Sequence, residues 1–388
     1  MKIVHFTKIY KDDWGYHENL LPKYHKKLGN DVWIIAGSDG VFGYGNNIEY
    51  EDCIYDSKDG IHIIRMKPKN SGKKAILFGR YFIYNTLKKI KPDYIFVHGI
   101  TEISPVFQAL VYRLSCNKKC IIAADNHDDE YNTRQHICSS FKERLYYRCL
   151  RLFRKFVLKN IDQVFGVLDC RTEYAINKLQ ANAKNCSVLY MGADDELIKI
   201  DQRESIRHKI CEDNKIDNNS FLIVSGGKLD RNKHVLELIS AFKKLTRIDT
   251  VLLLFGSVEK DIENDFFEAI HGNGRIIYLG FLNQQEIYDV FLSSDLACFP
   301  GGHSVLWEQA VGTGLPCVFA YRKGMTHVDL GGNCLFFDSY MVDEIVRKIE
   351  MCLKEDKYKE MKRISEDKGM DFFSYRSIAI RSLAIKDR

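Results

Sequence analysis

Two glycines and three cations form a candidate ligand site in SGGKLDRNKHVLELISAF (225–242). Lys228, Arg231 and Lys233 follow an apolar strand pattern and precede an amphipathic helix pattern. Glycine lets the backbone approach a ligand closely, and the start of a helix offers N–H groups and positive charge to an anion. These residues predict a site for a diphosphate; the alternative is a group of solvated surface charges.

A single carboxylate, Glu308, lies among apolar and small residues in GGHSVLWEQAVGTGLP (301–316). Ser304 can cap the helix that carries it, and the glycines and proline at the end of the segment stop that helix. A phosphate at the helix start and a vicinal diol on the carboxylate one turn later would together form a nucleotide-sugar site. Gly280, at the end of a strand pattern, allows close packing against a planar group.

Strand patterns alternate with helix patterns along most of the chain, starting at KIVHF (2–6) and again at FLIVSGG (221–227). Such alternation is typical of α/β proteins with parallel, doubly wound sheets. Two facing Rossmann-like domains with a cleft between them are the simplest fold that fits. We expect these domains at 1–195 and 196–370, and a C-terminal helix in 371–388 that packs back on the first domain.

The composition excludes some classes of protein. The chain has 388 residues, a net charge of +5 and twelve cysteines without a CxxC pair. This mild charge gives no reason to expect a nucleic-acid partner, and scattered cysteines are typical of free thiols in a reducing compartment. No signal-peptide pattern precedes the first strand, and no apolar run approaches about 18 residues. We therefore expect a cytoplasmic protein, with the inner face of the cytoplasmic membrane as an alternative location.

The strings GGKLDRNKH (226–234) and FPGGHSVLWEQAVGTGLPCV (299–318) resemble the donor-binding motifs of family 4 of the retaining glycosyltransferases. MGADDELI (191–198) is similar to the segment between the two domains of that family, so the resemblance covers nearly the whole chain. It implies the GT-B fold, a nucleoside-diphosphate-sugar donor that is UDP-linked, retention of configuration and no metal or other cofactor. The implied subgroup makes capsular or other surface polysaccharides.

The resemblance places Lys228 at the family's arginine position and Lys233 at its lysine position, both on the donor diphosphate. Glu308 takes the position of the family's second glutamate, which binds the ribose hydroxyls. Two departures follow. Lys228 offers a point charge instead of a planar fork, so Arg231 would share its role. Pro300 stands where the family's first glutamate is expected.

Further donor contacts follow from the same resemblance. It implies that Gly227, Gly280, Ser304 and Val305 line the donor site. His303 lies near the place from which the missing first glutamate would reach the donor sugar. Two interpretations of His303 stay open here, a contact to the sugar or its phosphate and a simple loop residue.

The first half of the chain contributes fewer candidates. The loop TKIYKDDWGYHENLL (7–21) contains Gly15 but no GxGxxG, which argues against a nicotinamide enzyme. The resemblance implies that Gly15 touches the donor phosphate and that His127, in AADNHDDEYNT (123–133), lies near the reacting sugar. The acids beside His127 make a metal site an alternative, although neighbouring residues rarely all face one ion. His98 is a weaker candidate, for which a buried, hydrogen-bonded histidine is the simpler interpretation.

FKERLYYRCLRLFRKFVLKN (141–160) carries seven cations and one acid among aromatic and aliphatic residues. This pattern predicts a basic amphipathic helix that can lie on an anionic membrane surface. The alternative is a helix whose apolar face simply joins the domain core.

The resemblance thus implies a hexosyltransferase that moves a sugar to a hydroxyl of a surface-polysaccharide or lipid-linked glycan acceptor. His127, Lys228 and Lys233 are the catalytic candidates, and the two lysines would stabilise charge on the leaving diphosphate. Two other functions stay open, an epimerase-type enzyme that processes nucleotide sugars and a binding protein that has lost activity.

Overall fold

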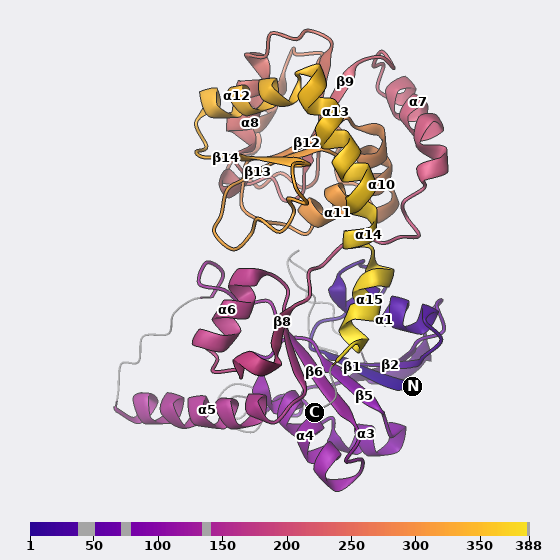
Figure 1. Ribbon diagram of the computed structural model, residues 1–388, viewed down its shortest axis with the longest axis vertical. Coiled ribbons are helices and arrows are strands. Elements are labelled where there is room, and N and C mark those ends of the chain that lie inside the picture. The colour runs from indigo at the N-terminus through magenta and orange to yellow at the C-terminus, as the bar shows by residue number, and fades with distance from the viewer. Residues whose placement is uncertain (38–50, 71–78, 134–140, 386–388) are drawn as a thin grey trace. The chain divides into compact units, whose positions relative to one another are not determined.

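The computed structural model describes residues 1–37, 51–70, 79–133 and 141–385, and the chain forms two compact units. The first unit comprises Met1–Tyr190 with Ile378–Arg388, and the second comprises Met191–Ser377 (Figure 1). The chain thus enters the second unit a few residues before the limit suggested by the sequence. It returns to the first unit within helix α15 (Tyr375–Leu383).

The first unit contains an eight-stranded sheet in the order β3-β4-β2-β1-β5-β6-β7-β8. All neighbouring strands are parallel except β3 and β4, which pair antiparallel at the edge. The strands are β1 (Lys2–Thr7), β2 (Asp31–Gly37), β3 (Cys53–Asp56), β4 (His62–Met66), β5 (Tyr94–Val97), β6 (Ile121–Asn126), β7 (Gln163–Gly166) and β8 (Cys186–Val188).

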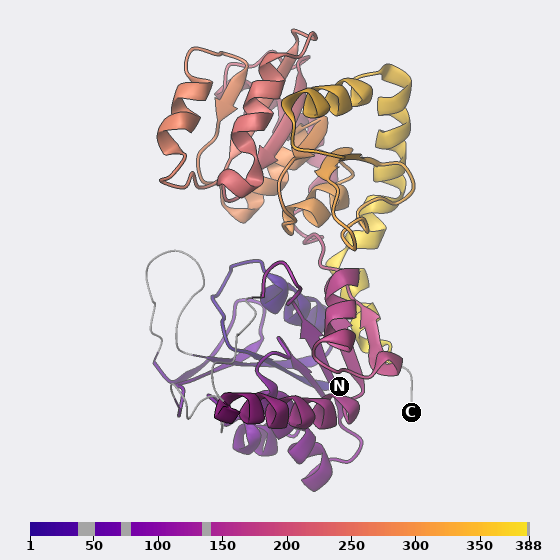
Figure 2. The same ribbon diagram turned by 90° about the vertical axis from the view of Figure 1, so that its left-hand side faces the viewer.

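Helices cover both faces of this sheet. The helices besides α15 are α1 (His17–Lys27), α3 (Tyr84–Ile90), α4 (Ile103–Ser115), α5 (Phe141–Lys159) and α6 (Asp169–Asn177). Helices α1 and α15 lie on one side of the sheet and α3 and α4 on the other (Figure 1). Helix α5 runs as one continuous helix along the outside of the unit (Figure 2).

The second unit contains a six-stranded, fully parallel sheet in the order β11-β10-β9-β12-β13-β14. Its strands are β9 (Phe221–Gly226), β10 (Thr250–Phe255), β11 (Ile276–Tyr278), β12 (Leu296–Phe299), β13 (Cys317–Ala320) and β14 (Cys334–Phe337). Its helices are α7 (Arg203–Asp213), α8 (Val235–Lys243), α9 (Glu263–Ile270), α10 (Gln284–Ser293), α11 (Leu306–Gly312), α12 (Val342–Cys352), α13 (Glu355–Ile364) and α14 (Met370–Phe373).

The strands of the second unit are continuous apolar runs in the sequence because their side chains are buried. Every residue of β9, β10, β12 and β13 is buried, as expected for parallel strands that helices cover on both faces. The predicted α/β class with two Rossmann-like domains is confirmed. None of the helices in the described part of the chain combines the length and the apolar character needed to cross a bilayer.

The strand order tells where ligands are expected in each sheet. Ligands of doubly wound sheets bind outside the carboxyl ends of the strands, at the point where the strand order reverses. That point lies between β1 and β5 in the first unit and between β9 and β12 in the second. The candidate residues from both halves of the sequence follow these strands or their immediate neighbours.

Candidate functional site

The turns after β9 and β12 come very close together in the second unit. Gly227, directly after β9, has a φ of 107°, a conformation that favours glycine. A Cβ atom on Gly301 would lie 2.3 Å from the Cα atom of Lys233, so only glycine allows this approach. The predicted diphosphate cations and the segment before Glu308 are therefore neighbours at the switch point of the sheet.

Lys233 connects these two turns. Its ammonium donates hydrogen bonds to the carbonyl oxygens of Gly302, at 2.5 Å, and His303, at 3.4 Å. Burial lowers the pKa of Lys233, an effect that Asp230 opposes and Arg322 reinforces. An ammonium has three N–H donors, and these two carbonyls occupy two of them. The location is consistent with the predicted role on the diphosphate, which stays a prediction.

Lys228 and Arg231 face acidic partners in their own unit. The ammonium of Lys228 lies 3.2 Å from a carboxylate oxygen of Glu259. Arg231 lies 3.2 Å from the carboxylate of Asp261 and donates to its carbonyl oxygen at 2.9 Å. Both cations are more than half exposed, so solvent screens these pairs. A diphosphate would have to compete with these carboxylates for both side chains.

Glu308 is completely buried in α11 and is held by two histidines. Its Oε1 atom lies 2.7 Å from Nε2 of His303 and 2.8 Å from Nε2 of His327. Burial alone would raise the pKa of Glu308, but the two histidines lower it well below its ordinary range. Its Oε2 atom is buried and has no hydrogen-bond partner in the described part of the chain. The carboxylate therefore retains an acceptor for a ligand hydroxyl.

His327 is a site residue that the sequence analysis missed. It lies in the loop after β13, in GMTHVDL (324–330), and its side chain is fully buried. No spacing rule links it to Glu308, because the two residues meet only through the fold. His303 was expected either to contact the sugar or to be a simple loop residue. Its ring, only 5% exposed, contacts Glu308, and its contact with the sugar stays a prediction.

The start of α11 differs from the expected cap. Helix α11 begins at Leu306, and its N-cap residue is Val305, whose φ and ψ are already helical. Ser304 accepts from the Leu306 N–H at 3.4 Å, a long contact, so Ser304 is not the N-cap. Gly280 has a φ of 74° and no atom within 4 Å of an added Cβ, consistent with the space predicted for a planar group.

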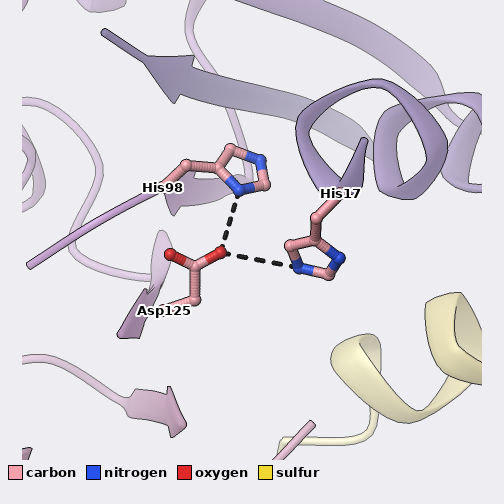
Figure 3. A group of neighbouring side chains, drawn as sticks. All are labelled: His17, His98 and Asp125. Atoms are coloured by element: carbon pink, nitrogen blue, oxygen red, sulfur yellow. Dashed lines mark hydrogen bonds and ion pairs between the residues drawn. The ribbon is translucent and has the colours of Figure 1, made fainter. Parts of the chain in front are cut away.

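A second buried carboxylate, Asp125, ends β6 in the first unit. Its Oδ2 atom lies 2.9 Å from Nδ1 of His98, 3.3 Å from Nε2 of His127 and 3.5 Å from Nε2 of His17. Figure 3 shows His98 and His17 directed at this oxygen. Burial alone would raise the pKa of Asp125, but His127 and His98 lower it well below its ordinary value. The carboxylate is therefore charged.

His127 lies between Asp125 and a pocket of about 1130 Å³ within the first unit. The ends of β1 and β5, the loop after β6, and helices α4 and α5 line this pocket, with Thr7, His98 and Arg154 among the lining residues. Burial alone would lower the pKa of His127, but Asp125 raises it. A histidine beside a pocket suits the predicted location near a reacting sugar, and that role stays a prediction.

The acids next to His127 do not converge on one point. Asp128 accepts a hydrogen bond from the Thr101 hydroxyl, Asp129 pairs with Arg171 at 3.0 Å, and Glu130 pairs with Lys178 at 3.0 Å. The three carboxylates thus have separate partners. They do not form the metal site that the acidic stretch left open as an alternative.

Gly15 precedes α1 with a φ of 66°, in the left-handed region. It allows the chain to turn into the helix whose first residue, His17, reaches Asp125. Its predicted contact with the donor phosphate stays a prediction.

A chain of buried histidines, which no motif in the sequence predicts, continues behind His98. Nε2 of His98 lies 3.1 Å from Nδ1 of His5, and Nε2 of His5 lies 3.0 Å from Nδ1 of His25. Nε2 of His25 then lies 2.7 Å from the hydroxyl of Ser382 in α15. Burial lowers the pKa of His5 well below its ordinary value and that of His25 to about 3, so both rings are neutral at pH 7.

Comparisons with known proteins agree with this arrangement. Residues 206–368 match the family model described as "Glycosyl transferases group 1". No curated protein sequence matches the chain significantly. A solved glycosyltransferase from Rickettsia africae ESF-5 has a similar structure, with 17% identity, a TM-score of 0.72, and coverage of 99% of this chain and 97% of that one.

Two further solved structures each cover 98% of this chain and 98% of their own. Anabaena Alr3699/HepE in complex with UDP has 16% identity and a TM-score of 0.68. WaaG, a glycosyltransferase involved in lipopolysaccharide biosynthesis, has 14% identity and a TM-score of 0.64. At these identities the likeness shows the fold, which is GT-B. The matched domain contains Lys233 and Glu308, and together with the fold it supports a glycosyltransferase enzyme.

Proposed function

We propose that the protein is a retaining hexosyltransferase of family 4 that uses a nucleoside-diphosphate sugar, UDP-linked, as its donor. The observation that carries this proposal is the pairing of Glu308 with Lys233 through one residue. The ring of His303 contacts Glu308, and its carbonyl oxygen accepts from Lys233. A carboxylate with an available acceptor and an ammonium thus lie on either side of His303. The carboxylate can accept from the ribose hydroxyls of a nucleotide, and the ammonium can pair with its diphosphate.

The donor half supplies charge for the departing nucleotide in this proposal. Oε2 of Glu308 accepts hydrogen bonds from the ribose hydroxyls, and Lys233, with Lys228 and Arg231, stabilises the negative charge that develops on the diphosphate. Gly227, Gly280, Ser304 and Val305 line the same site. This step uses no metal, because side-chain cations neutralise the leaving group.

The first unit supplies the acceptor side. His127 faces the pocket, where it would contact the reacting sugar, and Gly15 would contact the donor phosphate. The departing phosphate helps to deprotonate the acceptor hydroxyl. The acceptor oxygen then attacks the anomeric carbon from the face that the phosphate leaves, so the configuration at that carbon is retained. The acceptor is a surface-polysaccharide or lipid-linked glycan, a proposal supported by WaaG, whose title places it in lipopolysaccharide biosynthesis.

Helix α5 supports contact with an anionic membrane. Leu145, Leu152 and Phe156 share one face of the helix and are 53%, 61% and 58% exposed. Exposed cations, among them Arg148 and Lys155, lie beside them. Leu150 and Phe153, on another face, pack against the core. An exposed apolar stripe beside cations suits an interface between anionic headgroups and acyl chains, so we place the reaction at the cytoplasmic face of the membrane.

A thermal-shift panel of nucleotide sugars tests the donor proposal. We expect UDP-linked hexoses to raise the melting temperature of the wild-type chain and to have less effect on Glu308→Gln. The NMR signal of the product anomeric proton, measured with a glycan acceptor, tests retention. If the donor is consumed without an acceptor, the epimerase-type alternative replaces the proposal; if nucleotide binds and nothing reacts with any acceptor, the binding-protein alternative does.

Liposome flotation tests the membrane contact. We expect the wild-type chain to float with vesicles that contain anionic phosphatidylglycerol and to stay in solution with neutral phosphatidylcholine. Leu152→Glu with Phe156→Glu should abolish flotation, whereas Ile248→Glu, at an even more exposed apolar residue of the second unit, should not. Equal flotation of all variants would contradict the role of α5.

A further inference from the structure

Three imidazole nitrogens surround one oxygen of Asp125. The contact from Nδ1 of His98, at 2.9 Å, has the geometry of a hydrogen bond, whereas those from His127 and His17 are ion-pair contacts at 3.3 and 3.5 Å. The other oxygen of Asp125 already accepts the Gly99 N–H at 2.6 Å. A carboxylate oxygen has two lone pairs and cannot accept three well-aligned hydrogen bonds. The arrangement is better suited to one cation shared by several ligands.

We propose that His17, His98 and Asp125 bind a divalent metal ion of the zinc type. The atoms Nε2, Nδ1 and Oδ2 of these residues lie within 4.8 Å of one another, and all three side chains are buried (Figure 3). Two imidazoles and a carboxylate are ligands that zinc accepts, and a fourth position completes the coordination. Nε2 of His127 lies 3.3 Å from the same oxygen, and His127 lines the pocket. The fourth coordination position is therefore expected on the pocket side, and the pocket provides the path by which the metal ion enters.

The residues behind the ligands form the outer shell that such a site needs. A metal-bound histidine usually donates its second ring N–H to a neighbour, which fixes the tautomer and the orientation of the ring. Here Nε2 of His98 is hydrogen-bonded to Nδ1 of His5, and the Gly99 N–H donates to the second oxygen of Asp125. Two of the three ligands are therefore oriented by buried protein groups.

The hydrogen-bonded chain behind His98 holds this ligand in place. Its contacts are the carboxylate to His98, His98 to His5, His5 to His25, His25 to Ser382, and the Ser382 hydroxyl to the Ala379 carbonyl. The chain runs through buried side chains to α15, so it fixes the orientation of the His98 ring toward Asp125.

The proposed metal holds the start of α1 and the ends of β5 and β6 together beside the pocket. It goes beyond the proposed function, because the transfer step described above uses no metal and draws on cations of the second unit. It also departs from the sequence-based expectation of a protein without metal. The second histidine and glutamate group, His303, Glu308 and His327, also has ligand spacing. Both of its histidines have hydrogen-bond geometry to Oε1 of Glu308, so that group serves as the control.

Metal binding to the full-length chain tests the proposal without any nucleotide sugar. The chain is treated with a chelator, and Zn²⁺ is then added in a calorimetric titration. We expect one Zn²⁺ per chain, and visible d–d absorption bands of four-coordinate Co²⁺ when Co²⁺ replaces it. His17→Asn and Asp125→Asn should each remove the Zn²⁺ heat and the Co²⁺ bands, and His327→Asn should keep both. His5→Asn, which alters only the outer shell, should weaken Zn²⁺ binding by about 10- to 100-fold.

Three results would overturn the proposal. The wild-type chain would bind no Zn²⁺; His17→Asn would bind Zn²⁺ as tightly as wild type; or His327→Asn would abolish binding, which would place the metal on Glu308. Circular dichroism of each variant separates loss of the site from loss of the fold. His17→Asn keeps the test decisive if Asp125→Asn does not fold. None of these results depends on transferase activity, so the proposed function is tested separately.

Discussion

The two buried carboxylates, Asp125 in the first unit and Glu308 in the second, lie in similar settings and are used differently. Both are fully buried near the point where the strand order of their sheet reverses, and both are surrounded by histidines. Asp125 uses both of its oxygens on protein groups, whereas Oε2 of Glu308 has no hydrogen-bond partner among the described residues. Asp125 therefore organises side chains, and Glu308 retains an acceptor for a ligand.

If this comparison is correct, Asp125→Asn should have the largest effect on stability. The substitution leaves buried histidines without their carboxylate, which typically costs about 3–5 kcal/mol. We expect the free energy of unfolding, measured by urea titration at pH 7, to fall by about this amount. Asp128→Asn, an acid at the same strand end with one hydroxyl partner, is the matched control and should cost about 1 kcal/mol. Equal losses for the two variants would remove the special role of Asp125.

Lys233→Ala should produce the largest effect on turnover. Loss of a group that stabilises developing charge raises the barrier by about 2.7–4 kcal/mol, so kcat should fall by about 10²- to 10³-fold. Lys228→Ala is the matched control and should cost less, because Lys228 is half exposed and faces Glu259. Steady-state kinetics with a saturating donor would measure both. Wild-type kcat in Lys233→Ala would show that the diphosphate lies elsewhere.

The parallel strands and the donor-site candidates could be predicted because both leave local patterns. The apolar runs that begin the two halves of the chain form β1 and β9, and Lys233 and Glu308 follow the ends of β9 and β12. Two strands were missed for physical reasons. β3 is an exposed antiparallel edge strand, with Ile54 73% exposed, so it has no buried apolar run. β14 is a short strand in which only the first and last residues are buried.

His17 and His327, which also contact the two carboxylates, and the histidines behind His98 could not be predicted, because they come from distant parts of the chain. His5 and His25 lie in a strand and a helix pattern where a polar residue carries no signal, and they meet His98 only in the folded unit. His327 follows Glu308 by a loop and a strand, and no motif fixes that spacing. The resemblance to a family pointed to Glu308 as the carboxylate expected to bind ligand, but not to His327, which contacts it.

Glu308→Gln should weaken donor binding through the ribose hydroxyls. Hydrogen bonds to a charged group contribute about 1.5–3 kcal/mol, so we expect the Kd for UDP to rise by about 10- to 150-fold. Calorimetry with UDP and with its 2′,3′-dideoxy analogue forms a double-mutant cycle. The wild-type chain should prefer UDP, and Glu308→Gln should bind both ligands equally. If the variant still discriminates between them, the ribose is bound by another residue.

The smallest effect should appear in the pH dependence of stability. Burial alone would raise the pKa of Glu308, but His303 and His327 hold it below the ordinary 4.5. The folded-state pKa is therefore below the unfolded-state value, so the charged carboxylate stabilises the fold above about pH 4.5. This stabilisation is lost as the pH falls through the folded-state pKa, because the unfolded chain takes up the proton first.

Urea unfolding of wild type and Glu308→Gln at pH 7 and at about pH 3 measures this contribution. The difference in free energy of unfolding between the two proteins should be larger at pH 7 than at the acidic value. Asp249→Asn is a suitable control, because Asp249 also has a lowered pKa, caused by Arg247, but is exposed. Its difference should be small at both pH values, since solvent screens that pair. A Glu308→Gln difference that does not change with pH would mean that the two histidines do not favour the charged carboxylate.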